Sequence, residues 1–198
     1  MAPTRIVNFH GIGAPARTLE EGEPPYWISV EQYRRILDQA VAIEAAGGAR
    51  FVFTFDDGNK SDIEIGAAEL DARGLKGAFF PLAGRLDAPG SLSRADVRAL
   101  ADAGHKVGTH GRDHVSWLDL DAAAEQAEMV DARAALAEAA GAKIDMAAIP
   151  LGQYGRRTLA QLKAHGYRTV YTSDGGEADP AAWLQPRRSV RGDMSDAD

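Results

Sequence analysis

An acidic pair, Asp56 and Asp57, directly follows the apolar segment 50–55. Two carboxylates at the end of a buried strand repel each other and lose hydration, which a fold tolerates cheaply only beside a positive group. A divalent cation would supply that charge. Taken alone, the pair has a simpler interpretation, in which one Asp caps the next helix and the other faces solvent.

Two histidines form the second part of a possible metal site. His110 and His114 are four residues apart, a spacing that lets two imidazoles point the same way from a helical turn. Two His and one carboxylate are a recurrent catalytic ligand set that leaves a position for water. The chain has five His and no Cys, so a metal needs His, Asp or Glu ligands. The alternative is that both are ordinary surface or core residues.

These segments resemble the motifs of a known family. Thr-Phe-Asp-Asp-Gly at 54–58 resembles the first motif of the polysaccharide deacetylases, also called NodB-homology or carbohydrate esterase family 4 enzymes. The pair His110 and His114 resembles the second motif, and the segment 77–80 also fits the family. The resemblance covers roughly residues 5–175, and two motifs in this order are specific.

The resemblance implies a ligand set and a base. Asp57, His110 and His114 would bind a divalent metal, and Asp56 would be the general base. Zinc is the expected metal, with cobalt, nickel and iron as alternatives, because nitrogen and oxygen ligands do not choose among them. Gly111 departs from the family, which has Ser or Thr after the first His. That hydroxyl supports the loop, so we expect its loss to be tolerated.

The third motif of the family is altered here. It normally begins with an Arg that orients the base, but the corresponding segment 148–152 has no Arg. We expect a cation from the C-terminal part, Arg188 or Arg187, to pair with Asp56 instead. The backbone N–H of Leu151 is expected to stabilise the oxyanion, because a backbone amide needs no particular side chain.

The general acid of the family is also displaced. It is normally a His in a Leu-x-His motif near the C-terminus, and no such motif follows residue 166. Phe9-His10-Gly11-Ile12 resembles the aromatic-His start of deacetylases that act on poly-N-acetylglucosamine and have a permuted motif order. We therefore predict that His10 is the general acid. The alternative is a His that caps the first strand and binds a loop.

Aromatic residues give weaker signals. Tyr26 and Trp27 either form a platform that stacks against a sugar or anchor their loop to the next helix. Trp183 is expected to pack against the acid His, as a Trp does in the family. Trp117 and Trp183 are also candidates for lining the pocket, and ordinary core packing is at least as good an interpretation of both.

The elements that must position these residues alternate between short apolar runs and longer amphipathic ones. Strands are predicted at 5–9, 50–55, 77–81, 106–109, 143–149, 167–172 and, briefly, 188–190. Helices are predicted from the N-caps Ser29 and Ser93, and over 61–73, 119–140 and 158–165.

Repeated strand-then-helix order predicts an α/β fold with parallel strands. About seven strands suit a distorted or incomplete (β/α) barrel in one domain over residues 1–198, which is also the family's fold. An open doubly wound sheet is the alternative. Both place functional groups at the carboxyl ends of the strands, where His10, Asp56, Asp57 and His110 are predicted.

Composition excludes several classes of partner. The chain has 198 residues, is 45% hydrophobic and 26% charged, and carries a formal charge of −7. Such an acidic chain is poorly suited to nucleic acid. No apolar run is long enough for a membrane span, and the N-terminal residues do not resemble a signal peptide. We therefore expect a cytoplasmic protein, while the oligomeric state is left open.

The sequence thus predicts a metal-dependent hydrolase that removes acetyl groups from an N-acetylated carbohydrate. One alternative is a relative that binds metal and carbohydrate without turnover, which the altered third motif and the missing C-terminal His favour. Another is a hydrolase of small amides or acetyl esters on the same scaffold. A phosphatase ranks low, because no phosphate-binding Gly loop is present and the acids are adjacent.

Overall fold

The computed structural model describes residues 2–195, whose strands form three sheets. The largest sheet is parallel, in the order β10-β1-β4-β5-β6, and a smaller parallel sheet has the order β7-β8-β9. The strands of these two sheets are β1 (Thr4–Phe9), β4 (Arg50–Asp57), β5 (Gly77–Pro81), β6 (Lys106–Val107), β7 (Met146–Ala148), β8 (Thr169–Thr172), β9 (Leu184–Pro186) and β10 (Arg188–Ser189). A third sheet pairs β2 (Gly11–Ile12) with β3 (Trp27–Ile28).

The two larger sheets are connected at both sides. On one side, Thr109 bridges to Ala147, its N–H donates to the carbonyl of Met146, and its own carbonyl accepts from the N–H of Ala148. On the other side, the chain passes from β9 to β10 through a single residue, Arg187. The strands therefore follow one another around an incomplete barrel, which confirms the predicted distorted (β/α) fold over the open doubly wound alternative.

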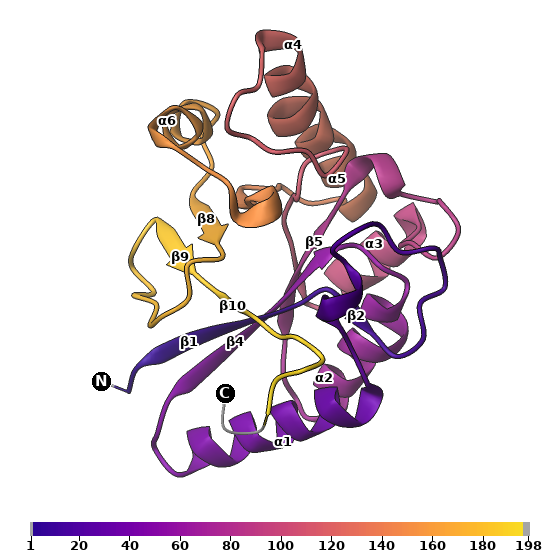
Figure 1. The fold of residues 1–198 in the computed structure, drawn as a ribbon, viewed down its shortest axis with the longest axis vertical. Helices are drawn as coiled ribbons and strands as arrows, with labels where there is room; N and C mark the ends of the chain where they lie inside the picture. The colour runs from indigo at the N-terminus through magenta and orange to yellow at the C-terminus, as the bar shows by residue number, and fades with distance from the viewer. Residues whose placement is uncertain (1, 196–198) are drawn as a thin grey trace.

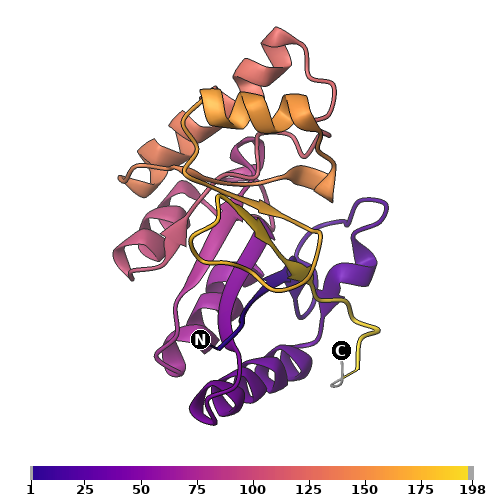
Figure 2. The same ribbon diagram turned by 90° about the vertical axis from the view of Figure 1, so that its left-hand side faces the viewer.

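Helices cover the outside of the strands. Figure 1 shows α1, α2 and α3 on one side of the five-stranded sheet, with β8 and β9 on the other. In Figure 2, α6 and the α4–α5 run lie above the strands and α1 lies below them. The helices and helical turns are η1 (Pro24–Tyr26), α1 (Val30–Ala45), η2 (Asp62–Ala67), α2 (Ala68–Ala72), η3 (Ala83–Arg85), α3 (Arg94–Asp102), α4 (Ala122–Glu125), η4 (Gln126–Asp131), α5 (Ala132–Ala140), η5 (Pro150–Gly152) and α6 (Arg156–Ala164).

Both predicted N-caps are present. The Ser29 hydroxyl accepts from the N–H of Gln32 at 3.0 Å, at the start of α1. Ser93 and Asp96 form a complete capping box at the start of α3. The predicted strands also lie in place, with ends that differ by a few residues. The short strands β2, β3 and β9 were not predicted, because two or three residues carry no readable alternation.

Two predicted helices are interrupted by wider turns. The segment predicted over 61–73 begins with the π-helix η2, and the one predicted over 119–140 contains the π-helix η4 between α4 and α5. A π turn inserts one extra residue into a helix, which shifts the face that later residues present. Apolar periodicity over a whole segment does not reveal such a single insertion, so the pattern predicts one regular helix for each segment.

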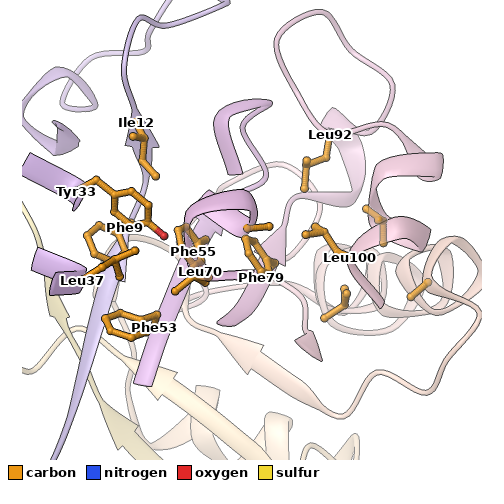
Figure 3. Close-up of a cluster of buried hydrophobic side chains, with 14 of the residues drawn as sticks. Phe9, Ile12, Tyr33, Leu37, Phe53, Phe55, Leu70, Phe79, Leu92 and Leu100 are labelled. Atoms are coloured by element: carbon orange, nitrogen blue, oxygen red, sulfur yellow. The ribbon is translucent and has the colours of Figure 1, made fainter. Parts of the chain in front are cut away.

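Side chains of β1 and β4 point alternately to two faces, so that aromatic side chains pack in an outer core and polar side chains face the barrel interior. Phe9, Phe55 and Phe79 are in register across β1, β4 and β5, with ring centroids 5.4 Å and 4.4 Å apart. Figure 3 shows these rings packed together beneath the helices. Because successive side chains of a strand alternate between faces, Asn8 and Thr54 point to the other face, inside the barrel. This inner face positions part of the site.

Candidate active site

The acid at the end of β4 and the two predicted histidines converge. Asp57 Oδ1 lies 3.6 Å from Nε2 of His110 and 3.6 Å from Nε2 of His114. One ligand atom from each of the three residues lies within 4.8 Å of the others. Asp57 and His110 are buried, whereas His114 is partly exposed. The three residues expected to bind metal therefore share one point at the carboxyl ends of the strands.

A backbone carbonyl orients the first histidine. His110 Nδ1 lies 2.9 Å from the carbonyl oxygen of Ala148 in β7. Since a carbonyl only accepts, Nδ1 must carry the proton, which leaves the Nε2 lone pair facing Asp57. Burial lowers the pKa of His110, despite the neighbouring carboxylates, so its imidazole is neutral at neutral pH. A neutral imidazole with an anchored N–H is the usual form of a metal ligand.

The donor atoms fit a divalent cation. Asp57 Oδ1 is buried and has no hydrogen-bond partner among the described residues. A buried carboxylate oxygen without a donor is costly unless a positive group neutralises it. Two imidazole nitrogens and one carboxylate oxygen form a ligand set that suits zinc and leaves room for a further ligand. Cobalt, nickel and iron suit the same atoms.

The histidines converge from a loop. Among the described residues, 110–114 belong to no helix, so the helical turn that their spacing allows is not the route. Gly111 has φ +86° and His114 has φ +55°, both in the left-handed region. Two residues four apart point the same way if their segment is helical, but the spacing does not show that a helix forms. Here two left-handed residues turn a loop to the same effect.

The second acid of the pair has a different partner. Asp56 accepts two hydrogen bonds of 2.7 Å from the guanidinium of Arg187 and one of 3.0 Å from Asn8 Nδ2. The arginine is 1% exposed, and its Nε also donates to the carbonyl of Thr172 in β8. The bidentate geometry fixes the plane of the carboxylate as well as its charge.

This pairing controls the protonation of Asp56. Burial acts to raise the pKa of Asp56, but the charge of Arg187 and its hydrogen bonds outweigh burial and hold the pKa well below its usual range. The carboxylate is therefore ionised at neutral pH. Its Oδ1 accepts a single hydrogen bond from Arg187 in the structure, so it retains a lone pair for a water molecule.

A cavity of about 440 Å³ brings these groups together with the N-terminal histidine. His10 lies beside Tyr26, with ring centroids 4.8 Å apart, and its Nδ1 is buried without a hydrogen-bond partner among the described residues. The carbonyl of His10 accepts from Asn59 Nδ2 at 2.7 Å, which fixes this strand end. The cavity is lined by residues that include His10, Tyr26, Trp27, Asp56, Asp57, His110, His114 and Leu151.

An acidic loop forms one wall of this cavity. Glu20 Oε2 lies 4.0 Å from Nδ1 of His114, and Glu20 is also paired with Arg85. Glu23 forms a bidentate pair with Arg17, with hydrogen bonds of 2.7 and 2.8 Å. The loop is therefore held by ion pairs, and it presents carboxylates to the metal-ligand side of the cavity.

Leu151, the expected oxyanion donor, lines the same cavity. Its φ is +58°, an unusual value for a branched residue, and its side chain is 54% exposed. This left-handed conformation turns its peptide relative to the preceding strand. The structure thus brings the residue to the cavity, while its expected use of the backbone N–H stays a prediction.

Two residues that were predicted to support the site, Arg188 and Trp183, lie outside it. The guanidinium that pairs with Asp56 belongs to Arg187; Arg188 is exposed and lines a different cavity of about 490 Å³ beside α1. Adjacent residues of an extended chain point in opposite directions, so only one of the two can reach the barrel interior. Trp183 donates its Nε1–H to the carbonyl of Tyr167 and packs in a separate core cluster, so the expected packing against His10 is wrong.

Several residues that support the site were not predicted from the sequence. Asn8 contacts Asp56 and Arg187 from β1, and its only sign in the sequence was an amide among the apolar residues 6–9. Glu128 is 3% exposed and lies beneath the loop 110–114. A regular amphipathic helix would place such a polar residue on its solvent-exposed face, so the pattern did not indicate a buried one. Trp117, considered for the pocket wall, instead packs in the core and donates to Glu128.

Comparison with known proteins matches the site and the fold. The family model described as polysaccharide deacetylase matches residues 44–170, which include the acidic pair and both histidines. YxkH of Bacillus subtilis (strain 168), whose name places it among polysaccharide deacetylases, is 24% identical over 140 residues, or 71% of this chain. This chain spans half of the length of that relative.

Solved structures share the whole fold. The Streptococcus pyogenes deacetylase PplD, solved in complex with acetate, has a TM-score of 0.79 at 16% identity, covering 98% of this chain and 95% of that one. A de-N-acetylase from Aggregatibacter actinomycetemcomitans has a TM-score of 0.77 at 14% identity, covering 98% and 97%. Among residues 2–195, no helix combines the length and apolar character needed to cross a membrane.

Proposed function

This chain belongs to the polysaccharide deacetylase family, and from that premise we propose that it is a metal-dependent hydrolase that removes acetyl groups from an N-acetylated carbohydrate. One observation carries the proposal. A single cavity contains three ligand atoms suited to a cation, an ionised carboxylate held by Arg187, and the imidazole of His10. These are the groups that amide hydrolysis needs.

Asp57, His110 and His114 would hold the metal, and zinc is the metal we propose. Bound there, a divalent cation would polarise the acetyl carbonyl and lower the pKa of the attacking water. The residues of the chain supply the remaining steps.

Asp56 accepts a proton from the attacking water as the water oxygen adds to the acetyl carbon. Arg187 holds the base in one orientation throughout. The N–H of Leu151 donates to the oxyanion that develops on the carbonyl oxygen. His10 then donates a proton to the nitrogen as the carbon–nitrogen bond breaks, so acetate and a free amine are released.

Two observations support turnover over the non-catalytic alternative. That alternative rested on the missing Arg of the third motif and the missing C-terminal His. A guanidinium from Arg187 reaches the base from another part of the chain, and His10 lines the same cavity as the base. A relative that is named as a de-N-acetylase supports an N-acetyl substrate over an acetyl ester.

The proposal is tested by acetate release from N-acetylglucosamine oligomers, acetylated xylan and small acyl amides. Metal-free protein should gain activity on the oligomers when zinc or cobalt is restored. Asp56→Asn should keep its metal and lose turnover by about 100-fold or more, because the base is removed and the ligands remain. Asp57→Ala should lose the metal itself, measured by elemental analysis after dialysis.

The two variants act as controls for each other, since they alter adjacent residues of one strand. Full activity of Asp56→Asn would remove Asp56 as the base. Activity on acetylated xylan or small amides alone would replace the carbohydrate N-acetyl substrate with that class.

A further inference from the structure

A buried carboxylate lies directly beneath the loop that carries both histidines. Glu128 belongs to the π-helix η4 and is 3% exposed. Its Oε2 accepts from the N–H of Arg112 at 2.9 Å and from Nε1 of Trp117 at 3.3 Å, and its Oε1 accepts from the N–H of Asp113 at 3.0 Å. No cation is needed to explain this charge, because three donors satisfy it.

The donors identify what the carboxylate holds. Arg112 and Asp113 are the middle residues of the loop from His110 to His114. Their side chains are exposed, so Glu128 holds the loop through their backbone N–H groups. Since His114 has φ +55°, its direction depends on the conformation of the two residues before it. The two N–H groups that Glu128 holds therefore belong to the two residues that precede His114.

The glycine after the first histidine fits this arrangement. A Cβ on Gly111 would lie 2.2 Å from Oε2 of Glu128 and 3.1 Å from the ring of Trp117. Its φ of +86° is also rarely adopted by other residues. The space that a side chain at position 111 would occupy is filled by the Glu128 carboxylate.

We propose that Glu128 is the positioning residue of the metal-binding loop, taking the place of a hydroxyl at position 111 by holding the loop from the neighbouring π turn. The extra residue of η4 matters because the carboxylate must point toward the loop while the following helix α5 keeps its own packing. The inference rests on the metal site of the proposed function, but it does not depend on the substrate.

Zinc affinity tests this role, measured by competition with a chromophoric chelator. Glu128→Gln keeps the size of the side chain but presents an NH₂ group to at least one N–H donor. The variant should bind zinc about 10–100-fold more weakly, as loss of an outer-shell partner commonly does. Its cobalt form should show an altered visible spectrum, because the position of His114 around the ion changes.

Glu125→Gln is the matched control on the same helical run. Glu125 pairs with His165 and Gln161 on α6 and its neighbouring turn, away from the loop. Zinc affinity of this variant should equal that of the parent protein. A zinc affinity of Glu128→Gln within twofold of the parent, with an unchanged cobalt spectrum, would overturn the proposal. The result is informative even if the parent protein binds zinc and releases no acetate.

A second pair of variants compares the loss of one donor to Glu128 with displacement of the Glu128 carboxylate. Trp117→Phe removes one donor to Glu128 and leaves both loop N–H bonds, so zinc affinity should fall by about threefold at most. Gly111→Ala should weaken zinc at least about 10-fold, because its Cβ displaces the carboxylate. A Trp117→Phe variant that weakens zinc binding as much as Gly111→Ala does would contradict the proposal, because it leaves both loop N–H bonds to Glu128 in place.

Discussion

Backbone strain is concentrated at the residues of the site. Four non-glycine residues in the described part of the chain have positive φ, and three of them are Asp57, His114 and Leu151. Such conformations cost about 1–3 kcal/mol each and persist only where the surroundings fix them. Two of these residues are ligand candidates and the third is the proposed oxyanion donor. The fold therefore tolerates unfavourable backbone conformations at the residues whose orientation matters for the proposed chemistry.

The role of His10 is testable at the same scale. His10→Ala should lower turnover about 100-fold, because the leaving nitrogen loses its proton donor, while zinc affinity stays unchanged. Initial rates of acetate release and chelator competition measure the two quantities. Tyr26→Phe serves as a control for disturbance of the neighbouring ring, and its rate should stay close to that of the parent. An undiminished rate in His10→Ala would assign the acid role to another group.

Among the elements, the loop before η1 depends most on charge. Arg17 pairs with Glu23 and also donates from Nε to Asn59, whose own amide holds the carbonyl of His10. Burial acts to raise the pKa of Glu23, but the Arg17 hydrogen bonds and the N–H of Glu20 outweigh it and lower the pKa from 4.5 to about 2. The ion pair thus connects the acidic wall of the cavity to the strand end that carries the proposed acid.

This pairing predicts a specific pH dependence. The folded pKa of Glu23 is below its unfolded value, so its contribution to stability is complete above pH 4.5 and is lost as the pH falls toward about 2. Urea unfolding should therefore show that Arg17→Met is less stable than the parent at pH 6, with a difference that shrinks below pH 4.5. A difference that stays constant or grows on acidification would contradict the assignment.

For the whole molecule, Arg187 connects the two sheets. It is the single residue between β9 and β10, and its guanidinium reaches Thr172 in β8 and Asn8 in β1 as well as Asp56 in β4. The rings of Phe80 and Tyr171 lie on it at 5.7 and 5.8 Å. The residue that orients the proposed base Asp56 therefore also joins the two edges of the barrel.

Removal of this guanidinium should affect stability and chemistry together. Arg187→Met should lower the free energy of unfolding by about 3–5 kcal/mol, because a buried carboxylate is left unpaired. The double variant Arg187→Met with Asp56→Asn should recover part of that loss, since the unpaired charge is gone. Arg188→Met, at the exposed neighbouring position, should change stability by less than about 0.5 kcal/mol. Equal losses in the Arg187 and Arg188 variants would exclude the buried pair as the cause.

The sequence by itself determined the strand and helix order, the N-caps and the local motifs. Apolar runs, capping residues and the segments 54–58 and 110–114 are short-range patterns, so the order of the amino acids is enough to interpret them. They placed the acids and histidines at strand ends and predicted the barrel, which the structure confirms.

Only the tertiary structure decided which distant groups meet. Arg187 and Asp56 are 131 residues apart, and the choice between Arg187 and Arg188 depends on strand register, where a shift of one residue reverses the face. The left-handed turn at His114, the π turn under it and the contact of Glu128 with the loop depend on packing between segments. Local sequence patterns carry no information on such contacts, because they form only when the barrel brings the segments together.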